Sequence, residues 1–184
     1  ARIGSRAAKD CQRVRQPLGA IVRDTVAAVM IPGDNRSIDL ELLDELPEVR
    51  VDAAKIQQSL INVISNAFKY SPGGGCVALS SELQEDRIGL RVRDEGLGMT
   101  PEQCARAFER FYRADSSGNI PGTGLGLSLV KEIIEIHGGS VDLDSAAGVG
   151  TTLTLWLPLA PPIGDAASAE TQDKGAAAPV LENA

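Results

Sequence analysis

Residues 52–70, DAAKIQQSLINVISNAFKY, carry two stripes of side chains at helical spacing. The first stripe is apolar and suits packing against a sheet: Ile56, Leu60, Ile64 and Ala67. The second is polar and lies beside it, at intervals of three and four residues: Ser59, Asn62, Asn66 and Lys69. Because asparagine is a mediocre helix former, its repetition on one face indicates a role beyond folding. Asp52 can cap this helix, and the SPGGG run at 71–75 ends it.

The segments on either side of this helix predict a mixed α/β architecture. Helical spacing covers 17–30, 101–108 and 123–137, with Thr123 as the expected cap of the last helix. Alternation predicts strands at 37–42, 49–51, 76–83, 87–94, 140–144 and 151–157. Residues 112–122 are polar and read as a mobile loop. The segment 1–16 is basic and irregular, and 161–184 is rich in Ala and Pro and predicts a disordered tail.

The composition narrows the possible classes of partner. The chain of 184 residues is 43% hydrophobic but only 3% aromatic, which predicts one aliphatic core. Its net charge of −7 argues against nucleic acid and against direct contact with an anionic membrane. Three scattered cysteines favour a reducing, cytoplasmic setting over a zinc site or a disulfide framework. No apolar run approaches a membrane span, and the start at Ala1 leads us to expect a fragment of a longer protein.

Asp94 ends the predicted strand 87–94 in phase with the apolar residues Ile88, Leu90 and Val92. Its carboxylate is therefore expected to point inward. A buried charge without a partner is costly, so this position predicts a group that the carboxylate binds. Taken alone, an aspartate here also fits a cap or turn at the end of a strand.

Four blocks stand in order along the chain: NVISNAFKY at 62–70, DEGLGM at 94–99, FERFYR at 108–113 and GTGLGL at 122–127. Together they resemble the N, G1, F and G2 boxes of the catalytic domain of sensor histidine kinases, over about residues 17–158. There is no GK[ST] signature of a P-loop, and the glycines miss the GxGxxG spacing of a dinucleotide fold. The resemblance implies the Bergerat ATP-binding fold, a two-layer α/β sandwich with helices on one face of a mixed sheet.

The resemblance also implies a site for ATP and Mg²⁺. Asp94 is expected to accept a hydrogen bond from the adenine amino group, and Gly96 and Gly98 to let the backbone turn close to the base. Asn66 and Asn62 are the expected metal ligands, because amide oxygens suit a hard cation that keeps waters. Lys69 and Arg113 are the expected phosphate-contacting cations, and Tyr70 is expected to line the nucleotide pocket. The lid hinge and the helix start that faces phosphate fall on the last matched block: Gly122, Thr123, Gly124, Leu125 and Gly126. Asn62, Lys69 and Arg113 are the expected catalytic group.

Each of these residues alone also fits an ordinary role, such as a solvated lysine or asparagine on a helix. Their shared stripe and the order of the four blocks favour the site. Phe108 and Phe111 match the F box and are expected to anchor the lid. His137 is the only histidine, and we expect it to be structural, at a helix end where the dipole favours a positive side chain.

The implied reaction is transfer of the γ-phosphoryl group of ATP to a histidine on a dimerisation domain, and onward to a cognate response regulator. Residues 1–16 would be the end of that domain and a linker, 17–160 the catalytic domain, and 161–184 the tail. The alternatives are a hydrolytic ATPase of the same fold, which has a glutamate at the position of Asn62, and an anti-sigma-type protein kinase. An amide at Asn62 cannot accept a proton from water at neutral pH, which favours the histidine kinase.

Overall fold

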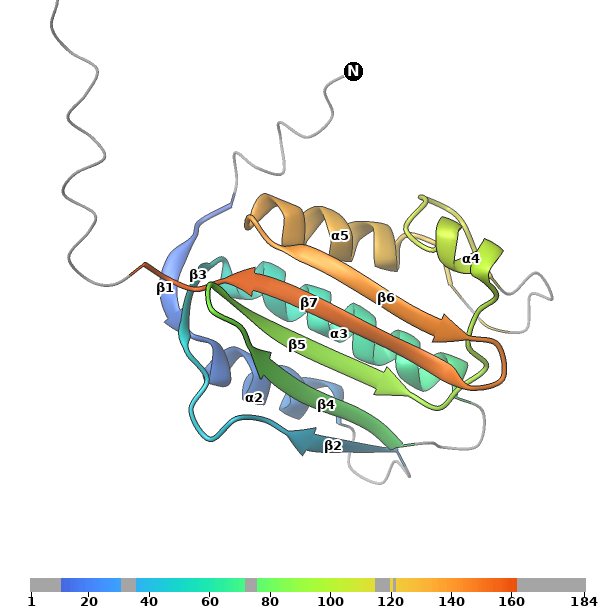
Figure 1. Cartoon of the computed structure of the whole chain (residues 1–184), viewed down its shortest axis with the longest axis horizontal. Helices are drawn as coiled ribbons and strands as arrows, with labels where there is room; N and C mark the ends of the chain where they lie inside the picture. Colours follow the sequence, from blue (N-terminus) through green and yellow to red (C-terminus); the bar gives the residue numbers. More distant parts are fainter. Residues whose placement is uncertain (1–10, 31–35, 72–75, 115–119, 121, 162–184) are drawn as a thin grey trace, which may run out of the picture.

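A computed structural model describes residues 11–30, 36–71, 76–114, 120 and 122–161. Its centre is a five-stranded sheet in the order β2-β4-β5-β7-β6 (Figure 1). The strands are β2 Ser37–Glu41, β4 Cys76–Leu83, β5 Arg87–Asp94, β7 Gly150–Pro158 and β6 Ser140–Ala146. Strand β2 runs parallel to β4, and the other neighbours are antiparallel. The sheet is therefore mixed, as predicted.

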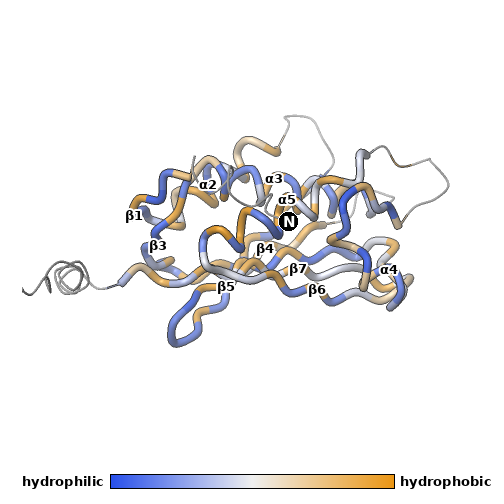
Figure 2. The backbone as a smooth tube through the Cα atoms, turned by 90° about the horizontal axis from the view of Figure 1, so that it is seen from above, coloured by the Kyte–Doolittle hydropathy of each residue, from blue (hydrophilic) through white to orange (hydrophobic). Residues whose placement is uncertain are grey.

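Three long helices cover one face of this sheet: α2 Leu18–Val29, α3 Ala53–Tyr70 and α5 Gly126–Ile136. Figure 2, turned by 90° from Figure 1, shows these helices as one layer on one side of the strands. The short helix α4, Pro101–Arg106, contacts β6, and a capping box formed by Thr100 and Gln103 starts it. The buried core between the layers is aliphatic. The two-layer α/β class with helices on one face is confirmed.

Helix α3 forms as its sequence predicts. The Asp52 side chain caps it by accepting from the Lys55 amide at 3.3 Å. All four residues of the apolar stripe are buried: Ile56, Leu60, Ile64 and Ala67. Ser59, however, is also fully buried and donates to the Lys55 carbonyl at 3.1 Å. It was wrongly placed on the polar stripe, because a hydroxyl that bonds to its own helix can join the packed face.

A small second sheet was not predicted. Strand β1, Val14–Pro17, pairs antiparallel with β3, Glu48–Val51. Arg15 holds it there, since its guanidinium contacts Glu48 and donates to the Pro161 carbonyl at 2.8 Å. Part of the segment expected to be an irregular linker is therefore a strand. Residues 1–10 and 162–184 lie outside the described residues, as does most of the predicted loop 112–122.

Helix α5 corrects two expectations. It begins at Gly126, and its N-cap is Leu125 without a side-chain hydrogen bond, so the prediction that Thr123 caps it is wrong. At the other end His137 is 2% exposed. Its Nδ1–H donates to the Ile133 carbonyl at 2.7 Å, and its Nε2 accepts from the Asp52 amide at 3.0 Å. Burial lowers the pKa of His137. The side chain is structural as expected, but neutral rather than positive.

None of the helices that the structure describes is long and apolar enough to span a bilayer.

Candidate functional site

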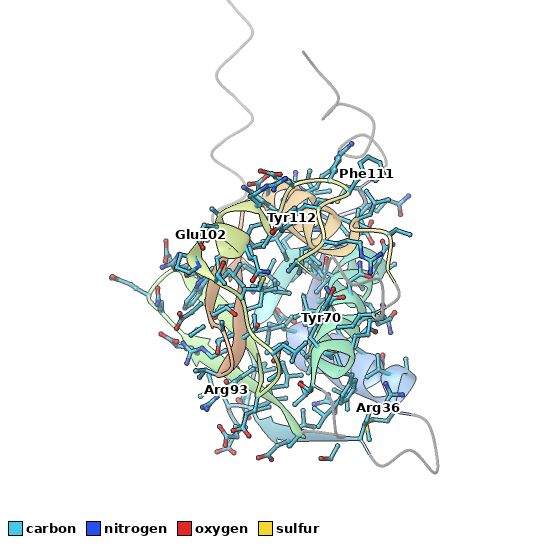
Figure 3. All side chains as sticks on the ribbon, turned by 90° about the vertical axis from the view of Figure 1, so that its right-hand side faces the viewer. Arg36, Tyr70, Arg93, Glu102, Phe111 and Tyr112 are labelled. Atoms are coloured by element: carbon cyan, nitrogen blue, oxygen red, sulfur yellow. The ribbon has the colours of Figure 1, made fainter. Side chains whose placement is uncertain are left out.

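A cavity of about 370 Å³ opens between helices α3 and α5, the ends of β5 and β7, and the loops around residues 98–126. Every residue predicted for the site except Gly96 lines this cavity. These residues are Asn62, Asn66, Lys69, Tyr70, Asp94, Gly98, Arg113, Gly122, Thr123, Gly124, Leu125 and Gly126. Figure 3 views this side of the molecule, with Tyr70 and Tyr112 labelled. The four sequence blocks, which are far apart in the chain, therefore meet around one cavity.

Asp94 lies at the sheet end of the cavity and is 7% exposed. Its Oδ1 accepts from the Gly96 amide at 2.9 Å. Burial raises the pKa of its carboxyl, while hydrogen bonds from the Gly96 and Thr151 amides oppose that rise. A carboxylate has about four acceptor positions, so two backbone bonds leave others for a ligand. The carboxylate that the sequence marked as inward is thus held in place as an acceptor.

The loop after Asp94 is clamped on both sides. The Leu97 amide donates to the Tyr70 carbonyl at 2.9 Å, and the Leu97 carbonyl accepts from Gly148 at 2.7 Å. A Cβ on Gly96 would lie 2.2 Å from the Tyr70 oxygen. Gly98 has φ +60°, and a Cβ there would lie 1.9 Å from the Ala146 oxygen. Gly96 therefore shapes the loop from behind the cavity, and Gly98 lines it.

The other end of the cavity is built by two helices. Asn62 and Asn66 of α3 are half-buried, and Lys69 is exposed. The first residue of α5 faces them, because a Cβ on Gly126 would lie 3.6 Å from Asn66 Nδ2. The free amides and the dipole at a helix start favour an anion such as phosphate. Amide oxygens, a cation and a helix start thus converge at one end.

The donor set fits a magnesium ion held largely by phosphate and water. Within the described residues, no group of three His, Cys, Asp or Glu side chains could hold a metal ion. Magnesium in nucleotide sites usually keeps several waters and takes only one or two protein ligands. The side-chain oxygens of Asn62 and Asn66 are enough for such a role.

The F and G2 blocks meet at a strained residue, Phe111. Phe111 has φ +66°, and its amide donates to the Gly124 carbonyl at 2.8 Å. Gly124 has φ +71°, and a Cβ on it would lie 2.6 Å from the Phe111 carbonyl carbon. Arg113 lines the cavity and donates to the Ile120 carbonyl. The F and G2 blocks are therefore joined by a backbone hydrogen bond beside the cavity.

The two phenylalanines of the F block behave differently. Phe108 packs against the core as expected. Phe111 is 73% exposed and points away from the protein (Figure 3). The expectation that Phe111 anchors the lid is therefore wrong. The positive φ turns this side chain outward, which a reading of hydrophobicity could not foresee.

Sequence reasoning missed Thr151, which lines the cavity directly beside Asp94. Its Oγ1 lies 2.9 Å from Ser145 Oγ. Thr151 is in phase with the buried Leu153 and Leu155 of β7. The reasoning that marked Asp94 as inward would therefore have found it. The apolar walls were also missed: Val92, Met99, Leu127, Leu129, Leu143 and Leu153.

Residues 51–161 match the family model described as histidine kinase-, DNA gyrase B-, and HSP90-like ATPase. The chain belongs to this ATPase family. Among solved structures, it is similar to a mycobacterial sensor histidine kinase, MprB, with a TM-score of 0.72, 27% identity and coverage of 80% of this chain and 99% of that one. The histidine kinase domain of the E. coli osmosensor EnvZ gives a TM-score of 0.62 and 30% identity, over 92% of this chain and 95% of that one.

Curated relatives of this ATPase-family domain include sensor histidine kinases. WalK of Bacillus subtilis is 42% identical over 127 residues, which cover 65% of this chain and 21% of WalK. SenX3 of Mycobacterium tuberculosis is 36% identical over 142 residues, which cover 75% of this chain and 34% of SenX3. The chain thus spans about a fifth of WalK and about a third of SenX3. It corresponds to the catalytic, ATP-binding domain of sensor histidine kinases.

Proposed function

We propose that the protein holds Mg-ATP in this cavity and transfers the γ-phosphoryl group to a histidine on a dimerisation domain, from which it passes to a cognate response regulator. One observation favours transfer to a histidine over hydrolysis of ATP. Among the described residues that line the cavity, Asp94 is the only carboxylate, and there is no histidine. Asp94 belongs to the sheet end, so the described residues of the phosphate end offer no base to activate water. An acceptor that needs no deprotonation before it attacks, such as the bare nitrogen of a neutral imidazole, suits this cavity better than water.

The two ends of the cavity suit the two ends of ATP. At the sheet end, the free acceptor positions of Asp94 would receive the adenine amino group. At the helix end, Asn62 and Asn66 would hold Mg²⁺, which supplies charge neutralisation for the phosphates. Lys69, Arg113 and the start of α5 would bind phosphate oxygens. The residues of this chain therefore position ATP and stabilise its charge, which is most of what phosphoryl transfer requires.

His137 is a poor candidate for the acceptor. Both ring nitrogens are already hydrogen-bonded, and the side chain is 2% exposed. It also follows α5, whose first residue lines the cavity and which is 11 residues long. At about 1.5 Å per residue, the two ends of that helix lie roughly 16 Å apart. The acceptor must therefore come from elsewhere, as a separate dimerisation domain would supply it.

Exposed apolar side chains beside the cavity support docking of an acceptor helix. Phe111 is 73% exposed and Leu125, which also lines the cavity, is 37% exposed. The Phe111–Gly124 backbone bond brings the two side chains to the same rim. An amphipathic helix can bury such residues and bring its histidine to the phosphate end. A pure ATPase would have no need for this surface.

Two other functions fit less well. A hydrolytic ATPase needs a base where Asn62 has an amide. An anti-sigma-type kinase transfers to serine and would not require the F block, which here forms part of the cavity through Tyr112 and Arg113. The three free cysteines fit a reducing, cytoplasmic reaction.

Transfer to a separate acceptor tests the proposal. The chain is mixed with radiolabelled Mg-ATP and with the dimerisation helix pair of its parent protein, made separately. We expect label on a histidine of the helix pair, lost in acid and kept in base, and much less label when Asp94→Asn replaces the wild-type chain at an ATP concentration that does not saturate the variant. The reaction will be slow, because separate molecules lack the effective concentration of a linked pair. Acid-stable label on serine would favour the anti-sigma type, and label on His137 would contradict our view of that residue.

A further inference from the structure

Asp94, Thr151 and Ser145 form a row across three strands. Asp94 on β5 is the register partner of Thr151 on β7, and Thr151 is the partner of Ser145 on β6. Directly opposed residues of an antiparallel pair point to the same face of the sheet. Asp94 and Thr151 line the cavity, whereas Ser145 lies behind Thr151 and does not. Ser145 can therefore act on a ligand only through its neighbour.

The Ser145 hydroxyl is fully used by three partners. It accepts from the Met99 amide at 2.9 Å and lies 2.9 Å from the Gly150 carbonyl, which can only accept. Thr151 Oγ1 is the third partner, also at 2.9 Å. A hydroxyl has one hydrogen and two lone pairs. With its hydrogen on Gly150, Ser145 has one lone pair for Met99 and one for Thr151.

This count fixes the direction of the Thr151 hydroxyl. All three bonds can exist together only if Thr151 donates its hydrogen to Ser145. Thr151 then shows the cavity lone pairs and no hydrogen. Beside it, Asp94 also shows acceptors. The polar wall at this end of the cavity therefore consists of acceptors and favours a base that carries a donor there.

We propose that Ser145 is a positioning residue for nucleobase selection, which turns the Thr151 hydroxyl into an acceptor. It thereby selects a 6-amino purine against a 6-oxo purine, whose carbonyl would face lone pairs. This inference rests on the proposed nucleotide site and adds a residue that does not touch the nucleotide. It also accounts for a polar side chain placed behind the cavity wall. The same hydroxyl links the Met99 amide to the Gly150 carbonyl at the start of β7. One side chain therefore both positions this loop and orients the Thr151 hydroxyl.

The test compares ADP with IDP, whose base carries a 6-oxo group and a hydrogen on N1 in place of the 6-amino group and the bare N1, by calorimetric titration of the full chain with Mg²⁺. The wild-type chain should prefer ADP by about tenfold or more. In Ser145→Ala the Thr151 hydroxyl is free to rotate and donate to a carbonyl, so the ADP/IDP affinity ratio should fall by about three- to tenfold. Ser145→Thr keeps the hydroxyl and should keep the ratio near the wild-type value.

A double-variant cycle shows whether the effect passes through Thr151. Thr151→Val should lower the ratio by a smaller factor, because it removes the acceptor without creating a donor. Adding Ser145→Ala to Thr151→Val should then lower the ratio no further. A general loss of fit in Ser145→Ala would weaken ADP and IDP alike and leave the ratio unchanged.

If the wild-type chain prefers ADP, an unchanged ADP/IDP affinity ratio in Ser145→Ala would overturn this inference and leave the proposed function intact. So would a ratio that Ser145→Ala lowers equally with and without the Thr151 hydroxyl. If Ser145→Ala does not fold, Thr151→Val decides, and a wild-type ratio in that variant overturns the inference. A wild-type chain that binds neither nucleotide would overturn the proposed function as well.

Discussion

The two ends of the cavity are built in different ways. At the sheet end, strand partners and backbone bonds fix Asp94, Thr151 and the Gly96–Met99 loop. At the helix end, Lys69 is exposed, Asn62 and Asn66 are half-buried, and the wall continues into residues 112–114 and 122–127. In the proposed complex, the rigid end would face the base, which does not change during the reaction. The more open end would face the phosphates, which do change.

The largest effect should come from a glycine at the rigid end. Gly98→Ala should lower the free energy of unfolding by about 2–4 kcal/mol, because its positive φ and the nearby Ala146 oxygen leave no room for a Cβ. Gly122→Ala at the open end is the matched control, since nothing lies within 4 Å of a Cβ there. Urea unfolding of both variants measures the difference. Equal stability of the two would remove the contrast between the ends.

Asp94→Asn should weaken ADP binding about ten- to a hundredfold, with or without Mg²⁺. The amide presents one acceptor and a donor where the base needs acceptors. Its oxygen can still accept from the Gly96 amide, and a buried charge is lost. The thermal midpoint of the variant should therefore not fall. Calorimetry and thermal unfolding together check this, and a lower midpoint would indicate that Asp94 is mainly structural.

Asn66→Ala should weaken binding of an ATP analogue by roughly tenfold in the presence of Mg²⁺, and much less without it. Asn62→Ala should act in the same direction. Gln57→Ala, on the same helix but away from the cavity, is the control. If both asparagine variants keep the wild-type dependence on Mg²⁺, the polar stripe is only a solvated face of the helix.

The smallest effect concerns pH. Burial raises the pKa of Asp94, so the ionised carboxylate costs the free chain stability at neutral pH, and this cost shrinks as the pH falls from the raised pKa to the ordinary value of the unfolded chain. ADP needs the ionised acceptor. Its affinity should therefore fall severalfold as the pH drops from about 7 to below that pKa, and Asp94→Asn should remove this contribution to the pH dependence. ADP binding that strengthens on acidification would contradict the assignment.

Local patterns predicted most of the fold and of the site. The stripes of α3, the hairpin of β4 and β5, and the inward phase of Asp94 each depend on neighbours in sequence. The pairing of β1 with β3 was missed because it joins segments more than thirty residues apart. The outward turn of Phe111 depends on a positive φ that no hydrophobic pattern encodes. The bond between Ser145 and Thr151 appears only once the register of β6 and β7 is known.

Phosphate release by the chain alone tests the central claim most directly, namely that the cavity orients ATP but has, among its described residues, no base for water. The wild-type chain, incubated with Mg-ATP, should release phosphate no faster than Asp94→Asn, although it binds ATP far better. Sustained turnover of many ATP molecules per chain, abolished in Asp94→Asn, would contradict the kinase assignment and favour a hydrolytic ATPase.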